Sequence, residues 1–145
     1  MNNGKNHKIP NLGFYYKNDL WFSKAYQDLT KSSRNLLHCL ISELRWSGKG
    51  RKKIFTNNGK VSFTERQFKD QLEYSSQTYL SARDQLIEVG LIRQTYRGGM
   101  CRGDMAQYEI LCVDNTPLDR KRWLKYPKNN WADEIPKVKE YSVGK

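Results

Sequence analysis

Residues 74–92, YSSQTYLSARDQLIEVGLI, bring together side chains that form directional hydrogen bonds. Apolar residues recur at helical spacing and predict one buried face: Tyr79, Ala82, Leu86 and Val89. The opposite face, near the amino end, carries Ser76, Gln77, Leu80, Ser81 and Asp84. A glutamine can pair bidentately with adenine, hydroxyl groups can donate or accept, and a leucine can touch a thymine methyl. The alternative is a helix that fills a core and shows these groups only to water.

Both ends of this segment carry helix-terminating chemistry. Ser75 is expected to be the N-cap, and Gly90 is placed to end the helix as a left-handed residue. Free N–H groups at a helix amino end and the positive end of the helix dipole attract phosphate. Ser75 and Thr78 are therefore candidate contacts to a nucleic-acid backbone, and Arg83, to one side, is a third.

A shorter helix is expected just before it. Thr64 and Gln67 have the capping-box spacing, and Phe63 and Phe68 stand at the hydrophobic-staple positions. Phe68 is expected to face the core, together with Leu72. Its two basic residues, Arg66 and Lys69, are further candidates for contacts to a nucleic-acid backbone.

The first half of the chain predicts two further helices. WFSKAYQDL, residues 21–29, is expected to be one short helix with its apolar side formed by Phe22, Ala25, Tyr26 and Leu29. Residues 30–46 follow an amphipathic stripe, with Ser32 or Ser33 as N-cap and a core face of Leu36, Leu37, Leu40, Ile41 and Leu44. His38 lies off that stripe, which predicts a solvated side chain.

Residues 46–60, WSGKGRKKIFTNNGK, interrupt the helices with glycine and asparagine and contain no acidic residue. Such a basic run is either a solvated loop or a set of phosphate contacts, with Lys52, Lys53 and Lys60 as the candidates. KVSF, residues 60–63, is expected to form a short strand.

LIRQTY and MAQYEILC, residues 91–96 and 105–112, are rich in β-branched and aromatic residues and predict two strands. The intervening RGGMCRGD has three glycines and two arginines, which indicates a hairpin with a basic tip. Its Arg97 and Arg102 are candidate contacts to phosphate or the minor groove.

Composition narrows the class of partner. The chain has 145 residues and a formal net charge of +11, which favours an anionic partner, with nucleic acid ahead of a membrane surface. A basic but otherwise ordinary protein is the alternative. Apolar runs fall short of the ~20 residues of a membrane span, and the amino end does not resemble a signal peptide.

The sequence contains no recognisable chemistry for catalysis or metal binding. Its three cysteines form no CxxC pair, which argues against a zinc site and against a disulfide framework, and suggests a reducing cytosol. No paired acids, nucleophile elbow or phosphate loop is evident. We therefore expect no enzyme, no cofactor and no small-molecule ligand.

The order of expected elements resembles that of winged helix-turn-helix domains. SSQTYLSARDQLIEVGLI resembles their recognition-helix segment, through Ser75, Thr78, Ala82, Leu86, Gly90, Leu91 and Ile92. From GFYYKNDL through NNGKVSFT to the hairpin, about residues 13–112, the chain is similar to small winged-helix proteins of bacterial phages, plasmids and mobile elements. Many helix-turn-helix sequences have glycine in the turn, where this chain has Glu73. If that position needs positive φ, glutamate costs roughly 1 kcal/mol.

The resemblance implies an α+β fold with an N-terminal arm (1–19), a winged-helix domain (20–113) and a basic aromatic tail (114–145). It implies a cytoplasmic, sequence-specific binder of double-stranded DNA that acts as a homodimer. The recognition helix, about 75–89, would enter the major groove, and the wing, about 97–103, would lie on the backbone or in the minor groove. Ser76, Gln77, Leu80 and Ser81 would contact bases.

Three roles stay open after this assignment. Transcriptional repression on a mobile element is the first, because the chain has room for little besides binding. Origin recognition in phage or plasmid replication is the second. A winged helix that binds a protein, with the aromatic tail or first helices as the contact, is an alternative of another class. In the tail, Trp123, Tyr126, Trp131 and Tyr141 are expected to anchor it on the domain or a partner subunit rather than to stack on bases.

Overall fold

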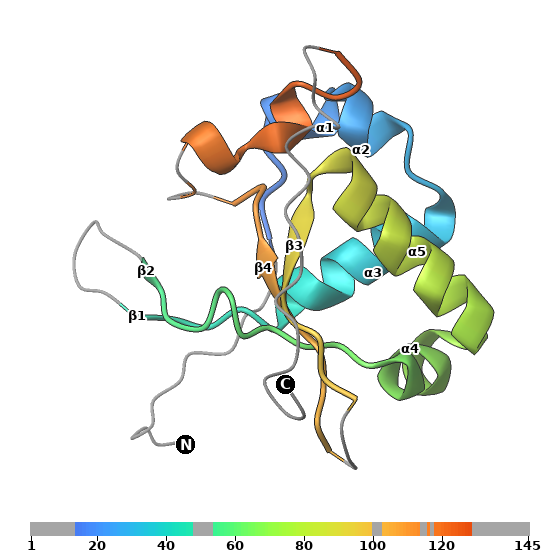
Figure 1. Cartoon of the computed structure of the whole chain (residues 1–145). Coiled ribbons are helices and arrows are strands. Elements are labelled where there is room, and N and C mark those ends of the chain that lie inside the picture. The colour runs from blue at the N-terminus through green and yellow to red at the C-terminus, as the bar shows by residue number, and fades with distance from the viewer. Residues whose placement is uncertain (1–13, 48–53, 100–102, 114–115, 117, 129–145) are drawn as a thin grey trace, which may run out of the picture.

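The structure is a computed structural model that describes residues 14–47, 54–99, 103–113, 116 and 118–128. It is an α+β protein, in which five α-helices pack with two antiparallel strand pairs in the part of the chain that is described (Figure 1). The expected α+β class is thereby confirmed. In these residues, none of the helices is both long and apolar enough to cross a membrane.

The amino-terminal helices are shorter than expected. Residues 21–29 form parts of two four-residue helices, α1 (Asn18–Trp21) and α2 (Lys24–Gln27), because the Ser23 hydroxyl caps the second one by accepting from Tyr26 N–H. Phe22 lies at the break between them and is 73% exposed, so its expected place in the core was wrong. Ala25, Tyr26 and Leu29 are buried as expected.

Helix α3 (Lys31–Ser42) provides the central apolar stripe and ends before residue 46, where the stripe was expected to end. Four of the five expected core residues lie in it, and all five, including Leu44 beyond its end, are buried. Its N-cap is Thr30, whose side chain accepts from Ser33 N–H, and not Ser32 or Ser33. Ser33 is instead buried inside the first turn.

Helices α4 (Glu65–Leu72) and α5 (Ser76–Val89) follow the expected boundaries closely. The capping box of Thr64 and Gln67 is present in full, and Phe63 and Phe68 are both buried. Leu72 was wrongly expected in the core: it occupies the last position of α4 and is 40% exposed.

Two antiparallel pairs make up the strands. β1 (Trp46–Ser47) pairs with β2 (Ile54–Phe55), where a loop was expected. β3 (Ile92–Tyr96) pairs with β4 (Gln107–Ile110), as expected, with a register shift between Gln94 and Tyr96. The expected strand at 60–63 is reduced to one bridge, Val61 with Tyr108.

The chain after β4 packs back onto the same core. Two 3-10 helices follow, η2 (Leu118–Arg120) and η3 (Arg122–Leu124), and Trp123 of η3 is 3% exposed and donates its indole N–H to Leu111 O at 3.1 Å. Tyr126 is half-buried and donates to the Asp28 carboxylate at 3.1 Å. Trp131 and Tyr141 lie outside the described residues.

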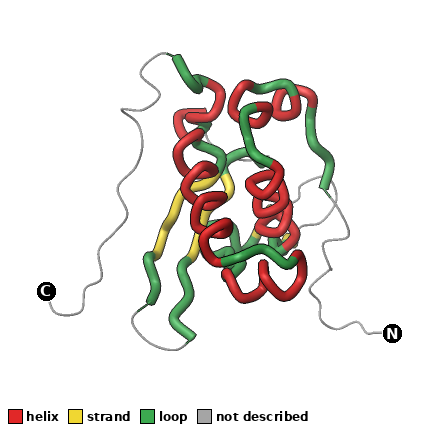
Figure 2. Tube along the Cα trace, turned by 90° about the vertical axis from the view of Figure 1, so that its right-hand side faces the viewer, coloured by secondary structure: helices red, strands yellow, loops and turns green. Residues whose placement is uncertain are grey.

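The elements divide between two ends of the molecule. Figures 1 and 2 both place α4, the amino end of α5 and the free end of the β3–β4 hairpin at one end. Helices α1 and α2 and the η2–η3 segment lie at the other end, beside the carboxyl end of α5. We call the first of these the hairpin end.

Candidate nucleic-acid interface

A tight turn joins α4 to α5 at the hairpin end. Glu73 has φ 64° and ψ 35°, the left-handed conformation, and its N–H donates to Lys69 O at 2.8 Å. It is the one non-glycine residue with positive φ among the described residues. Tyr74 then stacks on Phe68 with ring centroids 4.7 Å apart, and its hydroxyl accepts from the Asn35 amide at 2.8 Å. The turn is therefore anchored to both α4 and α3.

The amino end of α5 is held from inside and outside. Ser75 is the expected N-cap, and its side chain accepts from Thr78 N–H at 3.1 Å. On the buried side, the Tyr79 hydroxyl donates to Phe63 O at 2.6 Å. Burial raises the pKa of Tyr79 well above its ordinary value, so this hydroxyl stays protonated and keeps donating.

The exposed face of α5 is polar near its amino end, as expected. Gln77 and Ser81 are exposed, and neither side chain makes a hydrogen bond with another described residue. Ser76 differs, because its hydroxyl donates to the Glu65 carboxylate at 3.0 Å. Leu80 is half-buried against the core, so only part of its side chain is accessible.

Arg83, the only basic residue of α5, is already engaged. Its guanidinium donates to the Asp84 carboxylate through Nε and Nη2, at 3.1 and 2.9 Å, and its side chain is 27% exposed. Burial on its own lowers the pKa of Arg83, but nearby Tyr108 and the bonds to Asp84 raise it overall. Arg83 thus stays charged, and Asp84 neutralises its charge locally.

Two polar side chains, Gln85 and Arg122, fix α5 along its length. The Gln85 amide accepts from Ser33 Oγ at 2.5 Å and donates to Asp28 O at 3.1 Å, which ties the helix to the start of α3. At the carboxyl end, the buried Arg122 guanidinium donates to Glu88 O at 2.9 Å and to Ile87 O. A cation at a helix carboxyl end also matches the helix dipole. These contacts set the position from which α5 presents Gln77.

Hydrogen bonds shape the tip of the β3–β4 hairpin. Gly99 N–H donates to Asp104 O at 2.7 Å, and the Tyr96 hydroxyl donates to the Asp104 carboxylate at 2.8 Å. Gly98 has φ 69°, and a Cβ there would lie 2.5 Å from Ala106 N, so this position requires glycine. Arg97, beside it, is exposed.

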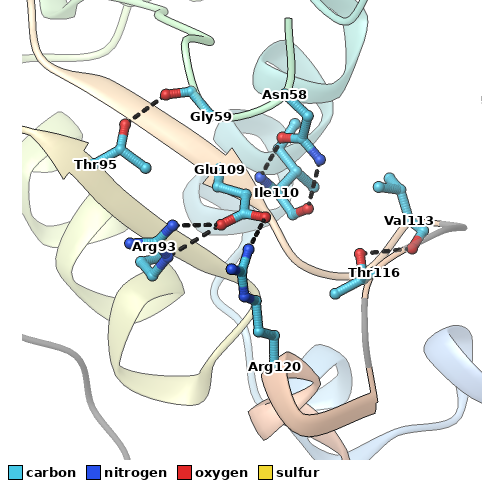
Figure 3. Close-up of polar contacts among 9 residues, drawn as sticks. All are labelled: Asn58, Gly59, Arg93, Thr95, Glu109, Ile110, Val113, Thr116 and Arg120. Atoms are coloured by element: carbon cyan, nitrogen blue, oxygen red, sulfur yellow. Dashed lines mark hydrogen bonds and ion pairs between the residues drawn. The ribbon is translucent and has the colours of Figure 1, made fainter. Parts of the chain in front are cut away.

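The base of the hairpin is fixed by an ion-pair network (Figure 3). Glu109 of β4 accepts from Arg93 of β3 at 3.0 and 2.7 Å, and from Arg120 of η2 at 3.0 Å. On the neighbouring loop, Asn58 exchanges two hydrogen bonds with the backbone of Ile110, at 2.7 and 3.0 Å. The hairpin is thus attached to the residues before α4 and to the segment after β4.

The structure describes some of the other residues that were expected to contact a nucleic-acid backbone. Lys60, Arg66 and Lys69 are exposed, and Arg66 lies 3.9 Å from Asp70 in a loose ion pair. Arg66 and Lys69 lie on α4, at the hairpin end (Figure 1). Lys52, Lys53 and Arg102 are outside the described residues.

Charge is unevenly distributed over these elements. Residues 65–89, which span α4 and α5, contain three basic and five acidic side chains, although the whole chain carries +11. Residues 46–60 contain five basic residues and no acidic one. The surface of α4 and α5 is thus polar and slightly acidic, and the positive surplus lies elsewhere in the chain.

Some of these contacts cannot be found from the sequence. The Ser76–Glu65 and Arg83–Asp84 contacts and the Arg122 cap depend on side-chain placement, whereas the sequence itself shows only the capping residues and the helical spacing.

Within the described residues, no three potential ligands among His, Cys, Asp and Glu come together to hold a metal ion. Searches of protein-family models, curated proteins and solved structures found no match to the chain.

Proposed function

We propose that the chain is a winged helix-turn-helix protein that binds double-stranded DNA in a sequence-specific manner. In this proposal α4, the Glu73 turn and α5 form the helix-turn-helix, and the β3–β4 hairpin is the wing. Their shared position at the hairpin end supports it, because one duplex can contact all of them. The net charge of +11 supports an anionic partner.

One observation carries the proposal: Gln77 and Ser81 are exposed on α5 and have no hydrogen-bond partner among the described residues. Around them the backbone is fixed by the Ser75 cap, the Tyr79 hydroxyl and the Gln85 contacts. Ready donors and acceptors on a rigid helix are what base readout in a major groove requires.

Selection of bound duplexes from a random DNA pool at about physiological salt tests this function. An enriched motif is the expected result, and a palindromic motif would indicate a two-fold dimer on two half-sites. Gln77→Ala with Ser81→Ala should weaken binding to that motif. Gln27→Ala is the matched control, because Gln27 is an exposed glutamine of α2 at the other end of the molecule. Absence of any DNA binding would refute the proposal.

A protein-binding winged helix is the second candidate, and the acidic surplus of residues 65–89 favours it. Phosphate contacts would be few on such a surface, whereas a basic protein partner would be attracted. The double substitution at Gln77 and Ser81 separates the two functions. It should abolish motif preference if DNA is the ligand and leave a charge-driven protein contact intact.

For the biological role, we prefer transcriptional repression on a phage or other mobile element to recognition of a replication origin. The support is the resemblance of the α5 segment to regulators of that kind. Mapping the selected motif distinguishes the roles: a motif that overlaps a promoter supports repression, and repeated motifs at an origin support replication.

A further inference from the structure

We propose that Glu65 is a specificity-determining residue, and that α5 together with Glu65 selects bases that present amino groups in the major groove. This inference rests on the proposed DNA binding. It starts from the contact between Glu65, in the first turn of α4, and Ser76, the first residue of α5, whose Oγ–Oε2 distance is 3.0 Å. Both side chains are exposed at the hairpin end.

The contact fixes where the negative charge lies. Ser76 belongs to the capped first turn of α5, and Gln77 is the next residue. The Glu65 carboxylate therefore lies beside the exposed face of α5 that carries Gln77 and Ser81, which we call the reading face. In the Ser76 contact the carboxylate accepts one hydrogen bond through Oε2. A carboxylate can accept about four hydrogen bonds, so capacity for a further donor remains.

No free positive charge on α5 offsets the negative charge of the Glu65 carboxylate. Arg83 is the only basic residue of the helix, and its guanidinium is bonded to Asp84. The most frequent reader of guanine, an arginine or lysine paired with O6 and N7, is therefore missing from the accessible part of α5. A carboxylate beside the face also repels those two guanine acceptors.

The chemistry of the groove edges then defines the preferred bases. Cytosine presents its N4 amino group, which aspartate and glutamate accept, and adenine presents N6 with N7, which glutamine pairs bidentately. Glu65 is assigned to a cytosine, and Gln77 to an adenine. Ser76, through its bond to Glu65, holds the carboxylate in place and is a positioning residue.

Selection from a random duplex pool, carried out in parallel for the unaltered protein and two variants, tests this assignment. For the unaltered protein we expect a motif with one cytosine and one adenine position. Glu65→Gln keeps a hydrogen-bond acceptor for Ser76 but exchanges a carboxylate for an amide. It should lower the cytosine preference by about five- to tenfold and shift that position toward adenine. The adenine position assigned to Gln77 should not change.

Asp70→Asn is the control for charge, because it removes the same charge from an exposed position five residues further along α4. Its 3.9 Å pair with Arg66 is loose. Both variants should bind DNA somewhat more tightly, and only Glu65→Gln should alter the motif. An unchanged motif in Glu65→Gln, or the same change in Asp70→Asn, would overturn the role of Glu65 while leaving DNA binding standing. If the unaltered protein binds no DNA at all, the proposed function is refuted, and this inference with it.

Discussion

At the scale of single residues, the backbone of Glu73 makes a stability prediction. A non-glycine residue in the left-handed conformation destabilises the folded state by about 1–2 kcal/mol. A new glycine relieves this strain but offsets part of the gain, because it raises the entropy of the unfolded chain and so costs roughly 0.4–1 kcal/mol of stability. Because φ is 64°, Glu73→Gly should raise the free energy of unfolding by about 0.5–1 kcal/mol, measured by urea denaturation. Gln71→Gly, inside α4 and exposed, is the control and should lower it by about 0.5–1 kcal/mol. A destabilised Glu73→Gly protein would show that the glutamate side chain stabilises the turn.

The buried thiol of Cys112 and the partly buried thiol of Cys39 predict how stability depends on alkaline pH. Burial raises the pKa of Cys112 to about 12, and burial, followed by Glu43, raises that of Cys39 to about 11. In the unfolded chain a cysteine thiol has a pKa of about 8.5. Above this pH the unfolded state therefore binds fewer protons than the folded state. The free energy of unfolding should therefore be unaffected by these groups below that pH and fall as pH rises toward 12.

Urea denaturation at a series of pH values between about 8 and 11 measures this effect. Cys112→Ala removes one of the two thiols, so its stability should decline less steeply over this range than that of the unaltered protein. Parallel declines in the two proteins would mean that Cys112 ionises in the folded state as easily as in the unfolded chain.

At the scale of elements, the local signals predicted α4 and α5 well. Thr64 with Gln67, Ser75 and Gly90 each act through contacts a few residues apart, so their effect can be read from the sequence. The misplacements have tertiary causes. Leu72 keeps the helical spacing, but α4 ends there. Ser33 has the chemistry of a cap, but its hydroxyl binds Gln85 of another helix.

The same distinction applies to the candidate site. Helical periodicity placed Gln77 and Ser81 on the exposed face, because it depends only on the turn of the helix. The contact of Glu65 with Ser76 was not predicted, because it arises from how the turn sets two helices against each other. The phosphate contact expected for Arg83 stays a prediction. In the structure its guanidinium donates to the adjacent Asp84, a local contact that helical periodicity does not reveal.

The η2–η3 segment should behave as part of the folded unit rather than as an appendage. Trp123 is 3% exposed, and its removal leaves a cavity and an unpaired Leu111 carbonyl, so Trp123→Ala should cost about 3–5 kcal/mol. Leu124→Ala, at the next position and 48% exposed, should change the free energy of unfolding by no more than about 0.5 kcal/mol. Urea denaturation of both variants provides the comparison, and equal small effects would show that the segment is not part of the cooperative unit.

At the scale of the whole molecule, the charge distribution separates affinity from specificity. The surface of α4 and α5 has more acidic than basic residues, while the chain as a whole is strongly basic. If the chain binds DNA as proposed, attraction to the phosphate backbone must come from individual lysines and arginines rather than from the net charge of α4 and α5. Base preference would then come from Gln77 and Ser81 of α5, together with Glu65 of α4.

The dependence of DNA affinity on salt can test this separation. Each phosphate that a protein neutralises contributes about 0.9 to the slope of log affinity against log salt concentration. Lys69 is exposed on α4. Lys69→Ala should therefore reduce that slope by about one and weaken binding to all sequences alike. Gln77→Ala should leave the slope unchanged and reduce only the preference for the selected motif. Lys24→Ala, in α2 at the opposite end, removes the same charge and should change neither quantity. If Lys24→Ala and Lys69→Ala lower the slope equally, the attraction is a property of net charge, and α4 does not lie on the DNA backbone.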